Sequence, residues 1–162
     1  MTHLNAAVAN AVPAVLAGIL SDGLGLQGTV SECLAPQPWP LGPHTRSEVL
    51  LVEGLVTLRL GVLVEPPVAD RILLALVGAN EGSTFDDEDR RDAVAEIANM
   101  LAGRLAAALR AEGFAMAISH PTGLPVPSSA PAGPSSTPGE AWQWVTSERL
   151  IVLNIAFEHR SK

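Results

Sequence analysis

The feature that most constrains the fold is a long helical pattern in the middle of the chain. No proline interrupts residues 84–112, and apolar side chains recur there at helical spacing. The helix is predicted to follow a cap at Ser83 or Thr84 and to end at Gly113. Its first turn is acidic, which suits the positive end of the helix dipole, and contains Asp86, Asp87 and Glu88. Such a helix needs a second layer of structure to cover its apolar side.

The side chains of this helix divide into two faces when they are placed at about 100° per residue. One face is apolar and is predicted to contact the core through Val94, Ile97, Leu101, Leu105 and Ala108. The opposite face carries Asp92, Glu96, Asn99, Gly103 and Arg110. Because Glu96 and Asn99 are three residues apart, their side chains are expected to be neighbours.

Two features of this polar face are open to more than one interpretation. Gly103 costs a helix interior about 1 kcal/mol relative to alanine, and amphipathicity does not require it. It could allow close approach of a partner protein, or it could serve helix packing inside the chain. The pair of Glu96 and Asn99 could likewise be an ordinary solvated surface, or a site that presents an acid and a carboxamide side by side.

The rest of the chain alternates between further helices and strands joined by hairpins. The first half is predicted to contain a helix at 5–20 with Pro13 inside it, strands at 47–52 and 55–64 with a turn at Glu53-Gly54, and a helix at 68–77 that ends at Gly78. The second half is predicted to contain a strand at 114–119 and a final hairpin of strands at 142–145 and 150–157. Residues 35–43 and 121–139 are rich in proline and are expected to be irregular, with an exposed Pro/Ser-rich loop at about 124–139.

This order of elements predicts one α+β domain that spans residues 1–162. Helices would pack on one face of a mostly antiparallel sheet, since hairpins join most of the strands. A chain of 162 residues is long enough to bury a substantial core.

Composition argues against several classes of function. The formal net charge is −7 and the ten Lys and Arg residues are scattered, so no nucleic-acid partner is expected. Cys33 is the only cysteine, which rules out a disulfide within the chain and favours a reducing compartment. The four histidines, at positions 3, 44, 120 and 159, lack metal-ligand spacing, so no metal site is predicted.

The apolar run at residues 6–20 could be a core helix, a signal peptide or a membrane span. It lacks a basic segment in front of it, is interrupted by Asn10 and Pro13, and is shorter than a membrane span. We interpret it as a core-packing helix, with a signal peptide as the alternative and no membrane association. The cytoplasm is then the default location.

The segment from Glu96 to Gly103, EIANMLAG, resembles the E-x-x-N-x-x-x-G signature of the CheC/CheX-type phosphatases of bacterial chemotaxis. The order of the predicted elements resembles that family over most of the chain, including the stretch ISHPTG at residues 118–123. CheC-like proteins carry two copies of the motif, whereas this chain has one and is therefore more similar to CheX. It departs from the family at Ala106, where many members have a lysine, and in the length of the Pro/Ser-rich loop.

The resemblance implies an enzyme that hydrolyses the aspartyl phosphate of a CheY-type response-regulator receiver. Asn99 would orient the attacking water, and Glu96 would dock against the receiver, with Asp92, Gly103 and Arg110 at the same interface. The enzyme would need no cofactor of its own, because Mg²⁺ would be bound by the phosphorylated receiver. A homodimer formed by strand addition near residues 150–157 would also be consistent with the family.

Two other functions remain compatible with the sequence. The chain could be a non-catalytic CheX-like module that binds a receiver or a flagellar-type partner. It could also be a structural or oligomeric domain in which Glu96 and Asn99 have no role beyond stability.

Overall fold

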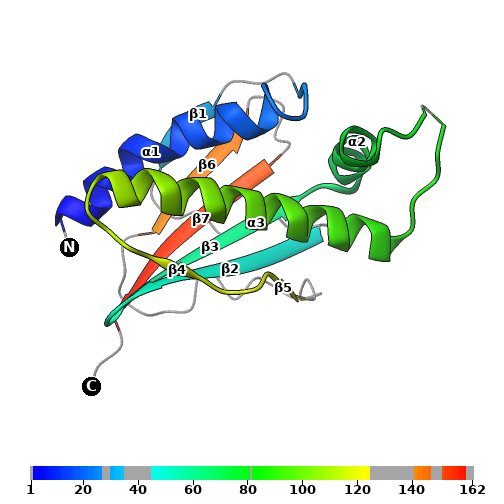
Figure 1. The fold of residues 1–162 in the computed structure, drawn as a ribbon. Helices are drawn as coiled ribbons and strands as arrows, with labels where there is room; N and C mark the ends of the chain where they lie inside the picture. The colour runs from blue at the N-terminus through cyan, green and yellow to red at the C-terminus, as the bar shows by residue number, and fades with distance from the viewer. Residues whose placement is uncertain are drawn as a thin grey trace.

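The computed structural model describes residues 2–26, 30–34, 45–80, 82–124, 141–146 and 151–159. These residues form seven strands in one sheet and three helices. The helices are α1 (Thr2–Leu20), α2 (Pro66–Val77) and α3 (Asp87–Ala111). Helices α1 and α3 lie side by side over the same face of the sheet, and α2 packs against α3 near one end of the sheet (Figure 1). The predicted α+β class is confirmed.

The sheet is antiparallel at every pairing of described strands and has the order β1-β6-β7-β3-β2-β4, with β5 also paired to β2. In chain order the strands are β1 (Val30–Leu34), β2 (Thr45–Glu53), β3 (Val56–Val64), β4 (Ala117–Ile118), β5 (Thr122–Leu124), β6 (Ala141–Thr146) and β7 (Ile151–His159). Both predicted hairpins are therefore present, as β2–β3 and β6–β7. The first turns at Gly54-Leu55, because Glu53 pairs with Val56 and Gly54 takes a left-handed φ of 59°.

Three of the strand predictions need correction. The strand expected at 114–119 is only β4, and Phe114 joins the turn that follows α3 through a backbone hydrogen bond to Leu109. Residues 122–124, which were placed in irregular chain, form β5 and pair with Arg46, Ser47 and Glu48 of β2. Strand β1 was not predicted at all. Most of the proposed Pro/Ser-rich loop, residues 125–140, and residues 35–44 lie outside the described part of the chain.

Strand β7 cannot support the dimer that was expected from strand addition near residues 150–157. It pairs with β3 along one side and with β6 along the other, so its backbone hydrogen-bonding groups are already used within the chain. The prediction that a dimer forms by strand addition at β7 is therefore wrong. That the protein forms a homodimer stays a prediction.

The ends of α3 are set by specific capping contacts. The N-cap is Asp86, and neither Ser83 nor Thr84 has that role. The Asp86 side chain accepts hydrogen bonds from the backbone N–H groups of Glu88 and Asp89, both at 2.8 Å. Asp89 returns the contact by accepting from the backbone N–H of Asp86 at 3.0 Å, which completes a capping box. The helix ends before Gly113, where φ is 95°.

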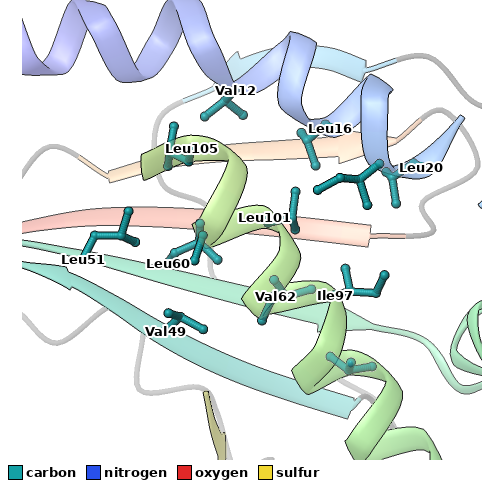
Figure 2. Close-up of a cluster of buried hydrophobic side chains, with 14 of the residues drawn as sticks. Val12, Leu16, Leu20, Val49, Leu51, Leu60, Val62, Ile97, Leu101 and Leu105 are labelled. Carbon is teal, nitrogen blue, oxygen red and sulfur yellow. The ribbon is translucent and has the colours of Figure 1, made fainter. Parts of the chain in front are cut away.

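The core lies between the helices and the sheet. Figure 2 shows Ile97, Leu101 and Leu105 of α3 lying among side chains from α1 and from the sheet. Four of the five predicted core residues of α3 are buried, and Ala108 is half-buried instead. The buried stripe is wider than the sequence indicated, because Ala98, Ala102, Ala106 and Leu109 are buried as well.

Helix α1 is longer than the sequence analysis allowed. Its stretch His3–Leu20 is long and apolar enough to cross a membrane, and half of that stretch is buried inside the protein. Val8, Val12, Leu16 and Ile19 are at most 1% exposed and contribute to the same core as α3. Pro13 lies on the exposed side without ending the helix. The helix therefore packs as a core element, as predicted.

Candidate functional site

The polar face of α3 points away from the core. Asp92, Glu96, Asn99 and Arg110 are exposed, and Gly103 is partly exposed. Among the described residues, Figure 1 shows no other helix or strand crossing the outer side of this helix. The five residues are together the outer face of α3, and we use that name below. At a rise of about 1.5 Å per residue, this face extends about 27 Å from Asp92 to Arg110.

The geometry of the face follows from how α3 is held. The buried side of the helix contacts α1, β2 and β3, and its first turn is fixed by the capping box. Glu96 and Asn99, one turn apart, present their Cβ atoms about 5–6 Å from each other. Leu101 and Leu105 anchor the same turns to the core, so the two polar side chains are carried by a rigid element.

Neither Glu96 nor Asn99 makes a side-chain hydrogen bond or an ion pair within the described part of the chain. The described arginines that do form ion pairs reach other carboxylates, such as that of Asp70 on α2. The carboxylate and the carboxamide are thus free to bind groups from another molecule.

Gly103 has open space where its side chain would be. A Cβ built on its backbone meets no described atom within 4 Å. Packing between helices inside the described structure therefore does not explain the glycine, and one of the two explanations offered by the sequence is removed. What remains is that Gly103 leaves an open site on the outer face. Between Asn99 and Arg110, the exposed Ala107 carries the only side chain that projects along this line of the helix.

The outer face is acidic toward the N-terminal half of α3. Glu88, Asp92 and Glu96 are all exposed and follow one another at intervals of four residues. Like charges at this spacing repel, and the helix places no basic residue three or four positions from Glu96. Glu88 was not assigned to the face by the sequence analysis, although the four-residue interval would have indicated it. This row favours a partner that brings a cation.

Two residues that anchor α3, both outside the outer face, have shifted pKa values. The hydrogen bond from the backbone of Asp89 is the main reason why the pKa of Asp86 lies below its ordinary value. The hydrogen bond with Asp70 is the main cause of a raised pKa at Arg90, whose Nε donates to Asp70 Oδ1 at 2.7 Å. This second contact ties α2 to the first turns of α3.

The described residues contain no group of three or more His, Cys, Asp or Glu side chains that could hold a metal ion. His3 and His120 are exposed and separate, and His3 stacks against Phe114 with ring centroids 5.7 Å apart. The side chains of Cys33, His44 and His159 lie outside the described part. What the outer face offers chemically is hydrogen bonding and charge.

Comparison with known proteins was made by sequence and by structure. No protein-family model matches the chain, and no curated protein matches it significantly. Solved structures do match over nearly the whole chain. A CheC-like superfamily protein from Shewanella sp. PV-4 superposes with a TM-score of 0.76 at 18% identity, covering 94% of this chain and 97% of the other.

Chemotaxis protein CheX from Vibrio vulnificus gives a TM-score of 0.71 at 18% identity, with 93% and 96% of the two chains covered. The CheX–CheY–BeF₃–Mg²⁺ complex from Borrelia burgdorferi gives 0.65 at 22% identity, with 96% and 98% covered. The chain has the CheC/CheX fold. The resemblance that was based on one octad and on the order of elements is confirmed at the level of the fold.

Within the CheC/CheX fold, one departure from the family pattern can now be placed. Ala106, where many members have a lysine, is only 7% exposed and belongs to the buried core cluster. Arg104 is exposed in the same turns, and its guanidinium lies beside Gly18 of α1. It was not assigned to the site from sequence, and its environment is considered below.

Proposed function

We propose that this protein is a CheX-like phosphatase that accelerates hydrolysis of the aspartyl phosphate on a CheY-type receiver in two-component or chemotaxis signalling. The observation that carries the proposal is the exposed carboxamide of Asn99, which has no partner among the described residues and lies beside the open surface at Gly103. The CheC/CheX fold supports it, and a CheX protein of that fold forms a complex with CheY. The setting would be the cytoplasm, where receivers act.

The reaction needs no covalent intermediate with this protein. The oxygen of a water molecule attacks phosphorus, the bond from phosphorus to the aspartyl oxygen breaks, and phosphate and a free aspartate are released. The leaving carboxylate is already a good leaving group, and Mg²⁺ on the receiver neutralises the phosphoryl oxygens. What this chain must add is the position of the water, in line with the bond that breaks.

Asn99 suits that task because a carboxamide both accepts and donates hydrogen bonds and carries no charge. Its oxygen can accept from the water while its nitrogen donates to a phosphoryl oxygen. A carboxylate in the same place would repel the phosphoryl group. For that reason we assign Glu96 to docking, where it accepts a charge-assisted hydrogen bond from a basic side chain of the receiver.

The remaining residues of the outer face shape the contact. Gly103 lets the loops of the receiver approach the helix closely, since no side chain projects there. Asp92 extends the acidic row that begins at Glu88, and Arg110 marks the far end of the footprint. The side chains of this face are exposed from Asp92 to Arg110, as a protein substrate requires.

The test compares phosphate release from phosphorylated receivers of the same organism with wild-type protein and with Asn99→Ala. The variant is expected to lose stimulated hydrolysis by on the order of 100-fold while it still binds the receiver and keeps its melting temperature. Glu96→Ala is expected to weaken binding by about tenfold. The matched control is Asn80→Ala, which removes an exposed asparagine outside α3.

The two other functions give different results in the same experiment. A non-catalytic docking module would bind a receiver through Glu96, and Asn99→Ala would change no rate. A purely structural domain would respond to neither substitution. Wild-type protein that accelerates no receiver of its organism would contradict the phosphatase proposal.

A further inference from the structure

One exposed basic side chain of α3 lies against a neighbouring helix. The guanidinium of Arg104 lies against Gly18 of α1, where Nη1 is 3.2 Å from the position that a Cβ on Gly18 would occupy. A real side chain at Gly18 would press on the guanidinium. Arg104 therefore lies on the flank of α3 that borders α1, one residue after the open surface at Gly103.

Arg104 has no ion-pair partner within the part of the chain that the structure describes, and it is exposed. Compensation of the helix dipole is the simplest alternative explanation for a cation near a C-terminus. That effect fades beyond the last turn, whereas Arg104 precedes Ala111, the last helical residue, by two turns. The dipole does not account for a guanidinium held at this place.

On the outer face, and on the flank that carries Arg104, the charges are polarised along α3. Glu88, Asp92 and Glu96 lie toward the N-terminal end, and Arg104 and Arg110 lie toward the C-terminal end. Asn99 and Gly103, which are uncharged, lie between the two groups. Glu96 and Arg104 are separated by about 12 Å along the helix axis, a distance that two side chains on one partner surface can span.

We propose that Arg104, propped against Gly18, binds a surface carboxylate of the partner receiver and thereby fixes the orientation in which the receiver docks. The inference rests on the proposed function and adds a chemical requirement to it. The receiver must offer a cation to Glu96 and a carboxylate to Arg104. Gly18 acts as a positioning residue, because it leaves room for the guanidinium.

The physical reason is that opposite charges at the two ends of the docking surface give the two orientations of the receiver different binding energies. A receiver turned end for end would bring its carboxylate to the acidic row and its cation to Arg104. Both contacts would then be repulsive, which suppresses the wrong complex and favours the one that places the phosphoryl group at Asn99.

The test measures the affinity of purified receivers of the same organism for wild-type protein, Arg104→Gln and Arg104→Glu, at several salt concentrations. Neutralisation is expected to weaken binding about threefold and charge reversal more than tenfold. The salt dependence should flatten in Arg104→Gln. In the rate assay, Arg104→Gln should raise the receiver concentration that gives half of the maximal rate by a larger factor than it lowers the maximal rate. The control is Arg91→Gln, an exposed α3 arginine that lies away from the outer face and bonds to the Asp87 carbonyl.

Gly18→Ala separates positioning from general stability. It is expected to weaken receiver binding about twofold to threefold, on the order of a distorted surface ion pair, in the wild-type background. In the Arg104→Ala background the same substitution should have no effect on affinity, because the group that it displaces is gone. An equal loss of affinity in both backgrounds would show that Gly18 acts through folding alone and would overturn its positioning role.

The outcomes distinguish this inference from the function on which it rests. Receiver binding that is unchanged by Arg104→Glu overturns the role of Arg104 and leaves the phosphatase proposal standing. Absence of receiver binding by the wild-type protein overturns both. Weaker binding in Arg104→Glu together with unchanged binding in Arg91→Gln supports the inference.

Discussion

At the scale of single residues, Gly103 gives the clearest separation between stability and function. Because a Cβ at this position meets no described atom, Gly103→Ala should stabilise the protein by about 1 kcal/mol through helix propensity. Gly103→Leu should also leave the fold intact but should project into the space needed by the receiver, reducing receiver affinity more than tenfold. Urea unfolding and receiver binding, measured on the same samples, check the two effects.

The control for Gly103→Leu is Ala111→Leu, which places the same leucine side chain at an exposed position in the last turn of α3. It should change neither stability nor binding appreciably. If Gly103→Leu bound receivers as tightly as the wild-type protein, the docking surface would have to lie elsewhere on the molecule.

The orientation of residues on α3 was predictable from sequence because one geometric constant, the helical repeat, sets it. Glu96 and Asn99 were expected on the side opposite Leu101, and the structure has them there. The exchange of Ala108 for Ala106 at the edge of the core was not predictable. It depends on which neighbouring elements pack against each flank of α3, and the helical periodicity alone does not reveal them.

At the scale of elements, the start of α3 depends on a carboxylate that titrates. The pKa of Asp86 is lowered mainly by the hydrogen bond from the backbone of Asp89, so the folded state favours the ionised cap. This contribution to stability is complete above the unfolded-state pKa of about 3.9 and is lost as the pH falls through the lower folded-state value. Asp86→Asn keeps a good cap without the charge.

We therefore expect Asp86→Asn to match the wild type near neutral pH and to show a smaller loss of melting temperature as the pH falls through 4. Asp86→Ala should be less stable near neutral pH, because no side chain then accepts from Glu88 and Asp89. Melting curves between neutral and acidic pH measure both. Identical pH profiles for Asp86→Asn and the wild type would contradict the role of the ionised cap.

Local signals also explain which elements the sequence revealed. The β2–β3 hairpin was predictable since its strands are adjacent in sequence and a glycine marks the turn. The cap of α3 was misplaced because several residues that can cap a helix follow one another, and the preceding loop decides which of them is used. Strands β1 and β5 were missed because each is short and pairs with a strand far away in the sequence.

At the scale of the whole molecule, the fold separates its stabilising interior from its binding surface. Strand β7 enters the sheet between β3 and β6, so the last described segment of the chain completes the centre of the sheet. No local pattern in the sequence specifies that insertion. It follows from long-range pairing, and it places α3 over a continuous sheet with its outer face directed to solvent (Figure 1).

This separation makes a prediction for Leu101, which is 1% exposed and lies between α1 and the sheet (Figure 2). Leu101→Ala should lower the free energy of unfolding by about 2–5 kcal/mol, a large part of the total for a domain of this size. Its side chain points away from Asn99, so stimulated hydrolysis per folded molecule should change little. Urea unfolding and phosphate release at low temperature measure the two quantities. Asn99→Ala should show the reverse, and loss of both stability and rate in either variant would mean that core and site are coupled.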